Sequence, residues 1–167
     1  MPVALGDHPP YHLLIESLVR DEKRNALIAS DVVSALKASR FPLLISDRKE
    51  HMERLERLIK EQASNDKDLS NIRIIRMDGS LTAKQRRAAI KEIGRSREAK
   101  EPTLIIATAS LIGEGFDLAD LDTLVLSMPL SFEGRMIQYA GRLHRLSDGK
   151  SDVLIYDYLD SSNAMLL

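Results

Sequence analysis

The sequence contains no cysteine, which excludes disulfide bonds and thiolate metal sites. Its four histidines lack the spacing of metal ligands, so no metal site is predicted. Aromatic residues make up only 4% of the chain, too few to suggest a platform of stacked rings for single-stranded nucleic acid. No apolar run approaches the roughly 20 residues of a membrane span, and no export signal is recognisable. We therefore expect a cytoplasmic protein without a membrane partner.

Neither sign of charge dominates the sequence. Lys and Arg number 24 and Asp and Glu 25, so any site for a polyanion must be local rather than a property of the whole surface. With 167 residues, 44% of them hydrophobic and 29% charged, the composition is that of one ordinary globular domain.

Hydrophobic periodicity predicts an alternation of strands and helices. Two helices are expected between Pro9 and Ser39, and residues 1–40 are interpreted as a helical lead-in that packs on a main domain of residues 41–167. In the main domain, strands are predicted at 43–46, 72–77, 103–107, 123–128 and 153–158, with helices at 47–63, 82–94 and 131–146. The helix from 82 is expected to begin at a Thr82–Gln85 capping box and to break up near Gly94 and Ser96. This order predicts an α/β fold, with a mainly parallel sheet and helices on both faces.

Ligands of such a sheet bind at the carboxyl ends of the strands, where the following loops converge. Here those loops begin at Ser46, Asp78, Thr108 and Met128. The loop after Ala107 carries small residues and two glycines, Gly113 and Gly115. Its backbone N–H groups and the Thr108 hydroxyl suit a phosphate, and Asp117 could accept from a ribose hydroxyl. An ordinary strand connection that uses glycine for its turns explains the same residues.

The helix expected at 131–146 carries a polar row at spacings of three, four and three residues: Arg135, Gln138, Arg142 and Arg145. The apolar stripe of this helix lies on another side, and no acidic residue joins the row. By contrast, the helix at 47–63 lines up Glu50 with Arg54, Glu53 with Arg57 and Glu56 with Lys60. The arginine row therefore suits an external anion, although a solvated cationic face is an equally good explanation of the spacing.

These segments carry a family resemblance. Gln138-Tyr139-Ala140-Gly141-Arg142-Leu143-His144-Arg145 resembles motif VI of superfamily 2 helicases, Q-x-x-G-R-x-x-R. Residues 108–117 resemble motif V, 43–48 motif IV, and Met77-Asp78-Gly79 the family block that comes next, all in the family's order. The resemblance spans about residues 11–160. It is closest to the excision-repair and type III restriction branch of the DEAD/DEAH-type helicases, partly through the stretch around Arg24 and Asn25.

The resemblance implies the second RecA-like domain of such a helicase, a three-layer sandwich. In similar proteins the motif VI arginines, here Arg142 and Arg145, reach the γ-phosphate of ATP that is held with Mg²⁺ mainly by the first RecA-like domain. Gln138 would lie near the nucleotide or its attacking water. Glu114, Gly115 and Asp117 would complete the nucleotide side.

The resemblance also implies nucleic acid as a partner, and the family branch favours DNA. Similar domains grip the phosphates of one strand with the loops after motifs IV and V. The strand-gripping residues expected here are Ser46, Arg48, Gly79 and Thr108. Contacts of this kind carry little sequence preference.

A phosphate-binding P-loop is missing from the sequence. Gly149-Lys150-Ser151 is rejected because His144 occupies the first glycine position and the triplet precedes a strand instead of a helix. We expect the isolated chain neither to hydrolyse ATP nor to unwind a duplex. The alternative is a non-catalytic RecA-like module that binds nucleic acid or protein, and a P-loop domain upstream in the same polypeptide would decide against it. The oligomeric state is left open.

Overall fold

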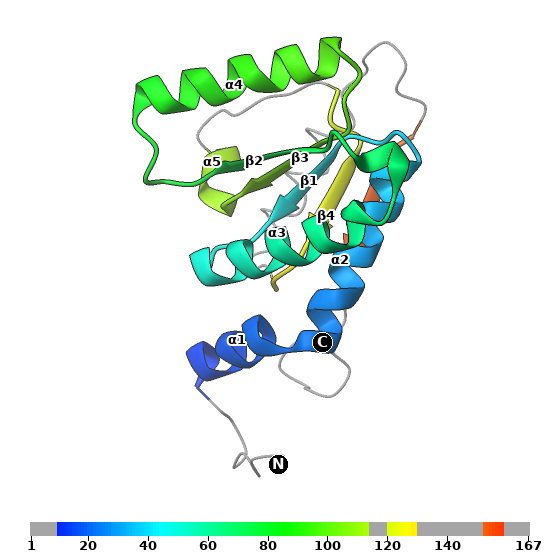
Figure 1. Cartoon of the computed structure of the whole chain (residues 1–167). Helices are drawn as coiled ribbons and strands as arrows, with labels where there is room; N and C mark the ends of the chain where they lie inside the picture. The colour runs from blue at the N-terminus through cyan, green and yellow to red at the C-terminus, as the bar shows by residue number, and fades with distance from the viewer. Residues whose placement is uncertain (1–9, 114–119, 130–151, 159–167) are drawn as a thin grey trace.

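The computed structural model describes residues 10–113, 120–129 and 152–158 (Figure 1). They contain one five-stranded sheet in which all paired strands are parallel, in the order β2-β3-β1-β4-β5. Its strands are β1 (Pro42–Ile45), β2 (Arg73–Met77), β3 (Thr103–Ala107), β4 (Thr123–Leu126) and β5 (Leu154–Asp157). The predicted α/β fold is confirmed, and each predicted strand lies within one or two residues of its expected ends.

Helices cover both faces of the sheet. On one face α2 (Glu22–Lys37) and α3 (Lys49–Ser64) pack on the even-numbered strand residues Leu44, Leu104 and Ile106. On the other face α4 (Ala83–Glu98) contributes Ile93 to a second core cluster, which includes Leu43, Ile45 and Ile105 of the strands and also residues of the short helix α5 (Ala109–Gly113). Figure 1 shows α4 and the α2–α3 pair on opposite sides of the strands. Strand residues that alternate between two apolar layers explain why β1, β3 and β4 are buried throughout.

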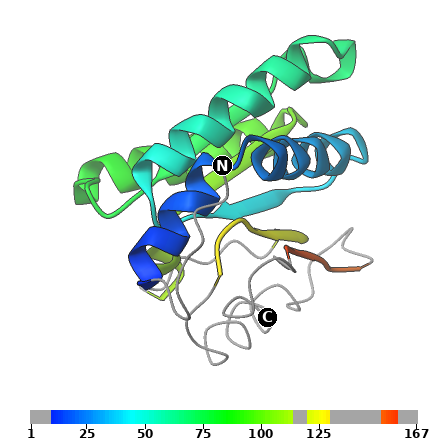
Figure 2. The same cartoon turned by 90° about the horizontal axis from the view of Figure 1, so that it is seen from below.

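The N-terminal segment forms the two expected helices, α1 (Tyr11–Arg20) and α2. Asp21 separates them and caps α2, since its side chain accepts a hydrogen bond from the Arg24 amide. Figure 2 shows α1 beside the α2–α3 layer when the molecule is seen from below. The division of the chain at residue 40 stays a prediction.

Helix α4 begins as predicted but runs further than predicted. The Thr82–Gln85 capping box is present, with hydrogen bonds of 2.9 and 3.1 Å. The helix does not break at Gly94 and Ser96 but continues to Glu98. Ser96 is buried, and its hydroxyl bonds to Glu101 and Thr103 beyond the helix. This tertiary anchoring outweighs the low helix propensity of the two residues. The helix ends where Lys100 adopts a positive φ of 56°.

The amino ends of β1, β4 and β5 are joined by Arg40. Its guanidinium donates to the Thr123 hydroxyl at 2.6 Å, the Asp122 carbonyl at 2.9 Å and the Asp152 carboxylate at 2.9 Å. Asp122 in turn accepts from the Phe41 amide at 2.8 Å. We call this end of the sheet the amino edge and the opposite end the carboxyl edge. At the amino edge the Arg40 guanidinium and the Asp122 carboxylate therefore both have partners within the domain.

Among the described residues, no helix is long and apolar enough to cross a membrane.

Candidate nucleic-acid interface

The carboxyl edge brings together loops from three adjacent strands. Ile45 and Met77 are both in register with Ala107 of the central strand β3, so the residues that follow them emerge side by side. The ladder continues one step past the strands, because the Ser46 amide donates to the Ala107 carbonyl at 3.1 Å and the Thr108 amide to the Met77 carbonyl at 3.3 Å. The sequence-predicted strand-gripping residues are thus placed on neighbouring loops.

The loop after β1 is joined to the loop after β3. The Asp47 carboxylate accepts a hydrogen bond of 2.9 Å from the Ala109 amide, the first residue of α5. Residues 109–113 form a short helix where the sequence predicted only a loop, and this hydrogen bond holds its first residue. The acceptor of this bond, Asp47, lies 62 positions earlier in the sequence, and local sequence patterns do not reveal such a contact.

Arg48 and Gly79 are exposed at this edge. Arg48 stands at the N-cap of α3 and no described acidic residue pairs with its guanidinium. A Cβ added at Gly79 would meet nothing within 4 Å, so packing does not require a glycine there. Thr108 is half-buried, and its hydroxyl lies 3.1 Å from that of Ser110. All three residues therefore keep part of their surface accessible to solvent at this edge.

Ser46 requires a correction. Its side chain is fully buried, and its hydroxyl is occupied by the His51 ring at 3.0 Å and by the Arg48 amide at 3.3 Å. The Ser46 hydroxyl therefore does not present itself to a phosphate. It holds the backbone of the exposed Arg48 instead.

Ser46 is part of a buried chain of hydrogen bonds whose direction is fixed. The Asn25 amide donates to the Val19 carbonyl at 2.8 Å, which leaves its Oδ1 to accept from His51 Nε2 at 2.9 Å. His51 Nδ1 therefore carries no proton and accepts from the Ser46 hydroxyl. The chain runs without interruption from Val19 on α1 to the Arg48 amide.

His51 is neutral in this chain. Burial, and then the charges of Arg24 and Arg54, lower its pKa to about 4. Arg24 is itself buried, and it donates to the Ser127 carbonyl at 2.6 Å. Metal-ligand spacing in the sequence does not single out His51. The available signal was that His51 lies four residues before Leu55 and eight before Ile59, on the buried face of α3.

Asp78 lies beside Gly79 at the end of β2. Hydrogen bonds from the Ser80 hydroxyl and then the Ser80 amide lower the pKa of Asp78, and Lys49 and Arg76 add to the effect. The carboxylate thus orders the turn that leads to the Thr82 cap. Among the described residues, no group of three His, Asp or Glu side chains could hold a metal ion.

The residues expected on the nucleotide side are not covered by the structure. Glu114, Gly115 and Asp117, together with Gln138, Arg142 and Arg145 of the expected 131–146 helix, all lie outside the described residues. The structure brings together one half of the expected site, at the ends of β1, β2 and β3.

The expected ion pairs of α3 are met in part. Glu50 pairs with Arg54 at 2.9 Å and Glu56 with Lys60 at 2.6 Å, as the spacing predicted. Glu53 instead approaches Arg76 of β2 at 3.6 Å, so its expected pair with Arg57 is replaced by a contact between helix and strand.

Comparison with protein families now adds to this geometry. Residues 22–147 match the family described as the helicase conserved C-terminal domain. The chain belongs to this family. The match begins at the first residue of α2 and takes in all three loops of the carboxyl edge. It places the domain among superfamily 2 helicases, as the resemblance implied.

Solved structures share the fold of this helicase C-terminal domain. T4 UvsW matches with a TM-score of 0.68 and 16% identity, over 92% of this chain and 29% of its own. Mss116p DEAD-box helicase domain 2, bound to an RNA duplex, gives 0.53 and 14%, over 77% and 49%. Mycobacterium smegmatis helicase Lhr, bound to ssDNA and AMP-PNP, gives 0.55 and 20%, over 77% and 16%.

The chain spans about half or less of the length of these three structures. No curated protein sequence matches it. The RecA-like fold of a helicase C-terminal domain is established by these comparisons.

Proposed function

We propose that this domain works as the second motor domain of an ATP-dependent DNA helicase or translocase. Its part is to supply arginine fingers to ATP and to grip one nucleic-acid strand at the carboxyl edge. The observation that carries the proposal is the placement of exposed Arg48 and Gly79 and half-buried Thr108 on three adjacent loops of a helicase C-terminal domain. The stretch around Arg24 and Asn25 supports the excision-repair and type III restriction branch.

The strand grip is supported by charge and by relatives. The Arg48 guanidinium offers planar paired donors to a phosphate, and exposed glycine at 79 lets a backbone come close. Mss116p domain 2 is bound to an RNA duplex and Lhr to ssDNA, which supports nucleic acid as the partner. DNA is proposed over RNA from the family branch.

ATP with Mg²⁺ is proposed to be held mainly by the first RecA-like domain of the same polypeptide. The donor chemistry of Arg142 and Arg145 fits a transferring phosphoryl group, since a guanidinium offers paired N–H donors to its oxygens. Gln138 would orient the attacking water, and Glu114, Gly115 and Asp117 would lie near the nucleotide. Lhr is bound to AMP-PNP, which supports nucleotide use by this kind of protein.

Turnover of the full-length protein tests the fingers. DNA-stimulated ATP hydrolysis is expected to fall about a thousandfold in Arg142→Ala and Arg145→Ala, because each removes donors from the developing phosphoryl charge. Arg142→Lys is expected to fall as well, since an ammonium cannot replace the planar fork. Arg135→Ala, from the same row but outside motif VI, is the control and should turn over at the parental rate. Unchanged turnover in both finger variants would overturn the assignment.

Binding of single-stranded DNA across a salt series tests the grip. Arg48→Ala is expected to reduce the slope of log affinity against log salt by about 0.7, the loss of one phosphate contact. Thr108→Ala should weaken binding without changing that slope, because it removes a neutral donor. Arg57→Ala is the control, an exposed arginine of the same helix that lies away from this edge. Matched RNA oligonucleotides test the preference for DNA, which equal affinities would remove.

A further inference from the structure

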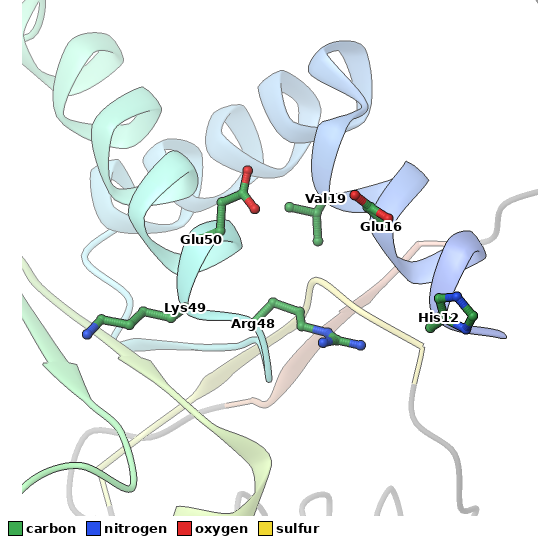
Figure 3. Close-up of a pocket in the computed structure, with 6 residues that line it drawn as sticks. All are labelled: His12, Glu16, Val19, Arg48, Lys49 and Glu50. Carbon is green, nitrogen blue, oxygen red and sulfur yellow. The ribbon is translucent and has the colours of Figure 1, made fainter.

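A cavity opens beside the strand grip, between α1 and the start of α3. Its volume is about 310 Å³, and it is lined by His12, Glu16, Val19, Arg48, Lys49 and Glu50. Figure 3 shows Arg48 extending across the cavity toward His12, while Lys49 points away. The volume lies at the small end of the range for ligand sites, about 300–1,000 Å³, and suits one flat group rather than a large ligand.

Among the described residues, the acids that line the cavity pair with arginines other than Arg48. Glu16 pairs with Arg20 at 2.8 Å and Glu50 with Arg54 at 2.9 Å, each along its own helix. Neither acid pairs with Arg48, and no other described acid does. The cavity therefore combines an available cation with an exposed imidazole and the apolar side chain of Val19.

The two walls of the cavity are held in fixed relation. Val19 on α1 and Arg48 before α3 both line it, and they are the two ends of the hydrogen-bond chain through Asn25, His51 and Ser46. The links through Asn25 and His51 are direct bonds between buried groups, and the last link reaches the backbone amide of Arg48, so the chain ties α1 to the residue before α3. A cavity with rigid walls binds a ligand at a lower entropic cost than one that must form on binding.

We propose that this cavity binds one nucleotide of the gripped strand, with its phosphate on Arg48 and its base against His12 and Val19. The proposal rests on the proposed function, since it places the strand at Arg48. It assigns α1 to the nucleic-acid interface, with His12 as a binding residue and His51 and Asn25 as positioning residues. Every base presents a flat face to an imidazole, so the site is expected to accept any sequence.

The test separates the base from the backbone. The full chain is titrated with a single-stranded deoxythymidine oligonucleotide and with an abasic oligonucleotide of equal length that retains the phosphates. His12→Ala is expected to weaken binding of the thymidine oligonucleotide about fivefold, the low end for a base stacked on a ring, and to leave the abasic one unchanged. His12→Tyr restores a ring and is expected to restore the lost affinity. Arg48→Ala is expected to weaken both oligonucleotides, because it acts on the phosphate.

Tyr11→Ala is the matched control, since Tyr11 is an exposed ring of the same helix that does not line the cavity. It should bind both oligonucleotides as the parent does. His12 is exposed, so its variants are expected to keep the parental thermal midpoint. The cavity assignment is overturned if His12→Ala changes neither oligonucleotide or weakens both equally, while Arg48→Ala still weakens both. A parent chain and an Arg48→Ala variant that bind equally poorly would overturn the strand grip itself.

Discussion

Arg40 and Arg48 lie at opposite ends of strand β1 and have different roles. Arg40 precedes β1 at the amino edge, is largely buried, and spends its donors on Thr123, Asp122 and Asp152. Arg48 follows β1 at the carboxyl edge, is exposed, and has no described acidic partner. Internal hydrogen bonds and ion pairs thus occupy the Arg40 guanidinium at the amino edge. At the carboxyl edge the Arg48 guanidinium is available to a ligand.

Removing Arg40 gives the largest expected effect. Arg40→Ala should lower the free energy of unfolding by about 3 kcal/mol, because three charge-assisted hydrogen bonds joining β1, β4 and β5 are lost. Arg48→Ala is its matched partner and should change the same quantity by less than about 0.5 kcal/mol. Urea denaturation of both variants is the measurement. Equal losses would abolish the distinction between the two edges.

A decrease in pH is expected to lower the stability of the folded protein through protonation of His51. Its pKa is lowered from 6.5 to about 4 in the folded state, so the folded protein binds fewer protons than the unfolded chain between these values. Stability should therefore be complete above about pH 6.5 and fall as pH decreases, by about 2 kcal/mol at about pH 5. The loss ends once pH passes below the folded pKa. Urea denaturation of the parent at several pH values measures it.

His51→Gln provides the comparison for this prediction. The variant lacks the titrating ring and should lose the His51 part of the pH dependence, although it starts from a lower stability at pH 7. A parent and variant with the same slope between pH 5 and 6.5 would show that protonation of His51 does not contribute. Carboxylates titrate in both proteins and cancel in the difference.

The smallest effect is expected at the cap of α4. Thr82→Ala should lower the free energy of unfolding by about 1 kcal/mol, because the backbone amide of Gln85 loses the Thr82 hydroxyl as its acceptor. Thr82→Ser keeps that acceptor and should retain most of the stability. Since the cap follows the turn that holds Gly79, single-stranded DNA affinity measured alongside would show whether local order of this turn matters to the grip. A Thr82→Ala variant with parental stability would contradict the energetic importance of the capping box.

The strands and most helix starts could be predicted because their signals are local. Leu43–Ile45 and Thr103–Ala107 are short apolar runs, and Thr82 with Gln85 is a recognisable cap. The rule for parallel sheets predicted that the loops after the strands converge at one edge. The register of β1, β2 and β3 confirms this for the three loops that follow them.

What escaped prediction depends on contacts distant in sequence. The resemblance implied Ser46 as a strand-gripping residue, and only the fold shows that His51 and the Arg48 amide occupy its hydroxyl. The length of α4 depends on how Ser96 meets Thr103, and the start of α5 depends on Asp47. The assignments of Arg142 and Arg145 rest on motif resemblance and stay predictions.

The bond between Asp47 and the Ala109 amide has a mechanical consequence. Because the Asp47 carboxylate joins the loop after β1 to the first residue of α5, a displacement of the backbone near Arg48 is transmitted to α5 through this bond as well as through the Ser46–Ala107 bond. Exchange of the Ala109 amide proton with solvent would report the tension on that link. Asp47→Asn should speed the exchange, since a neutral acceptor holds the amide less firmly.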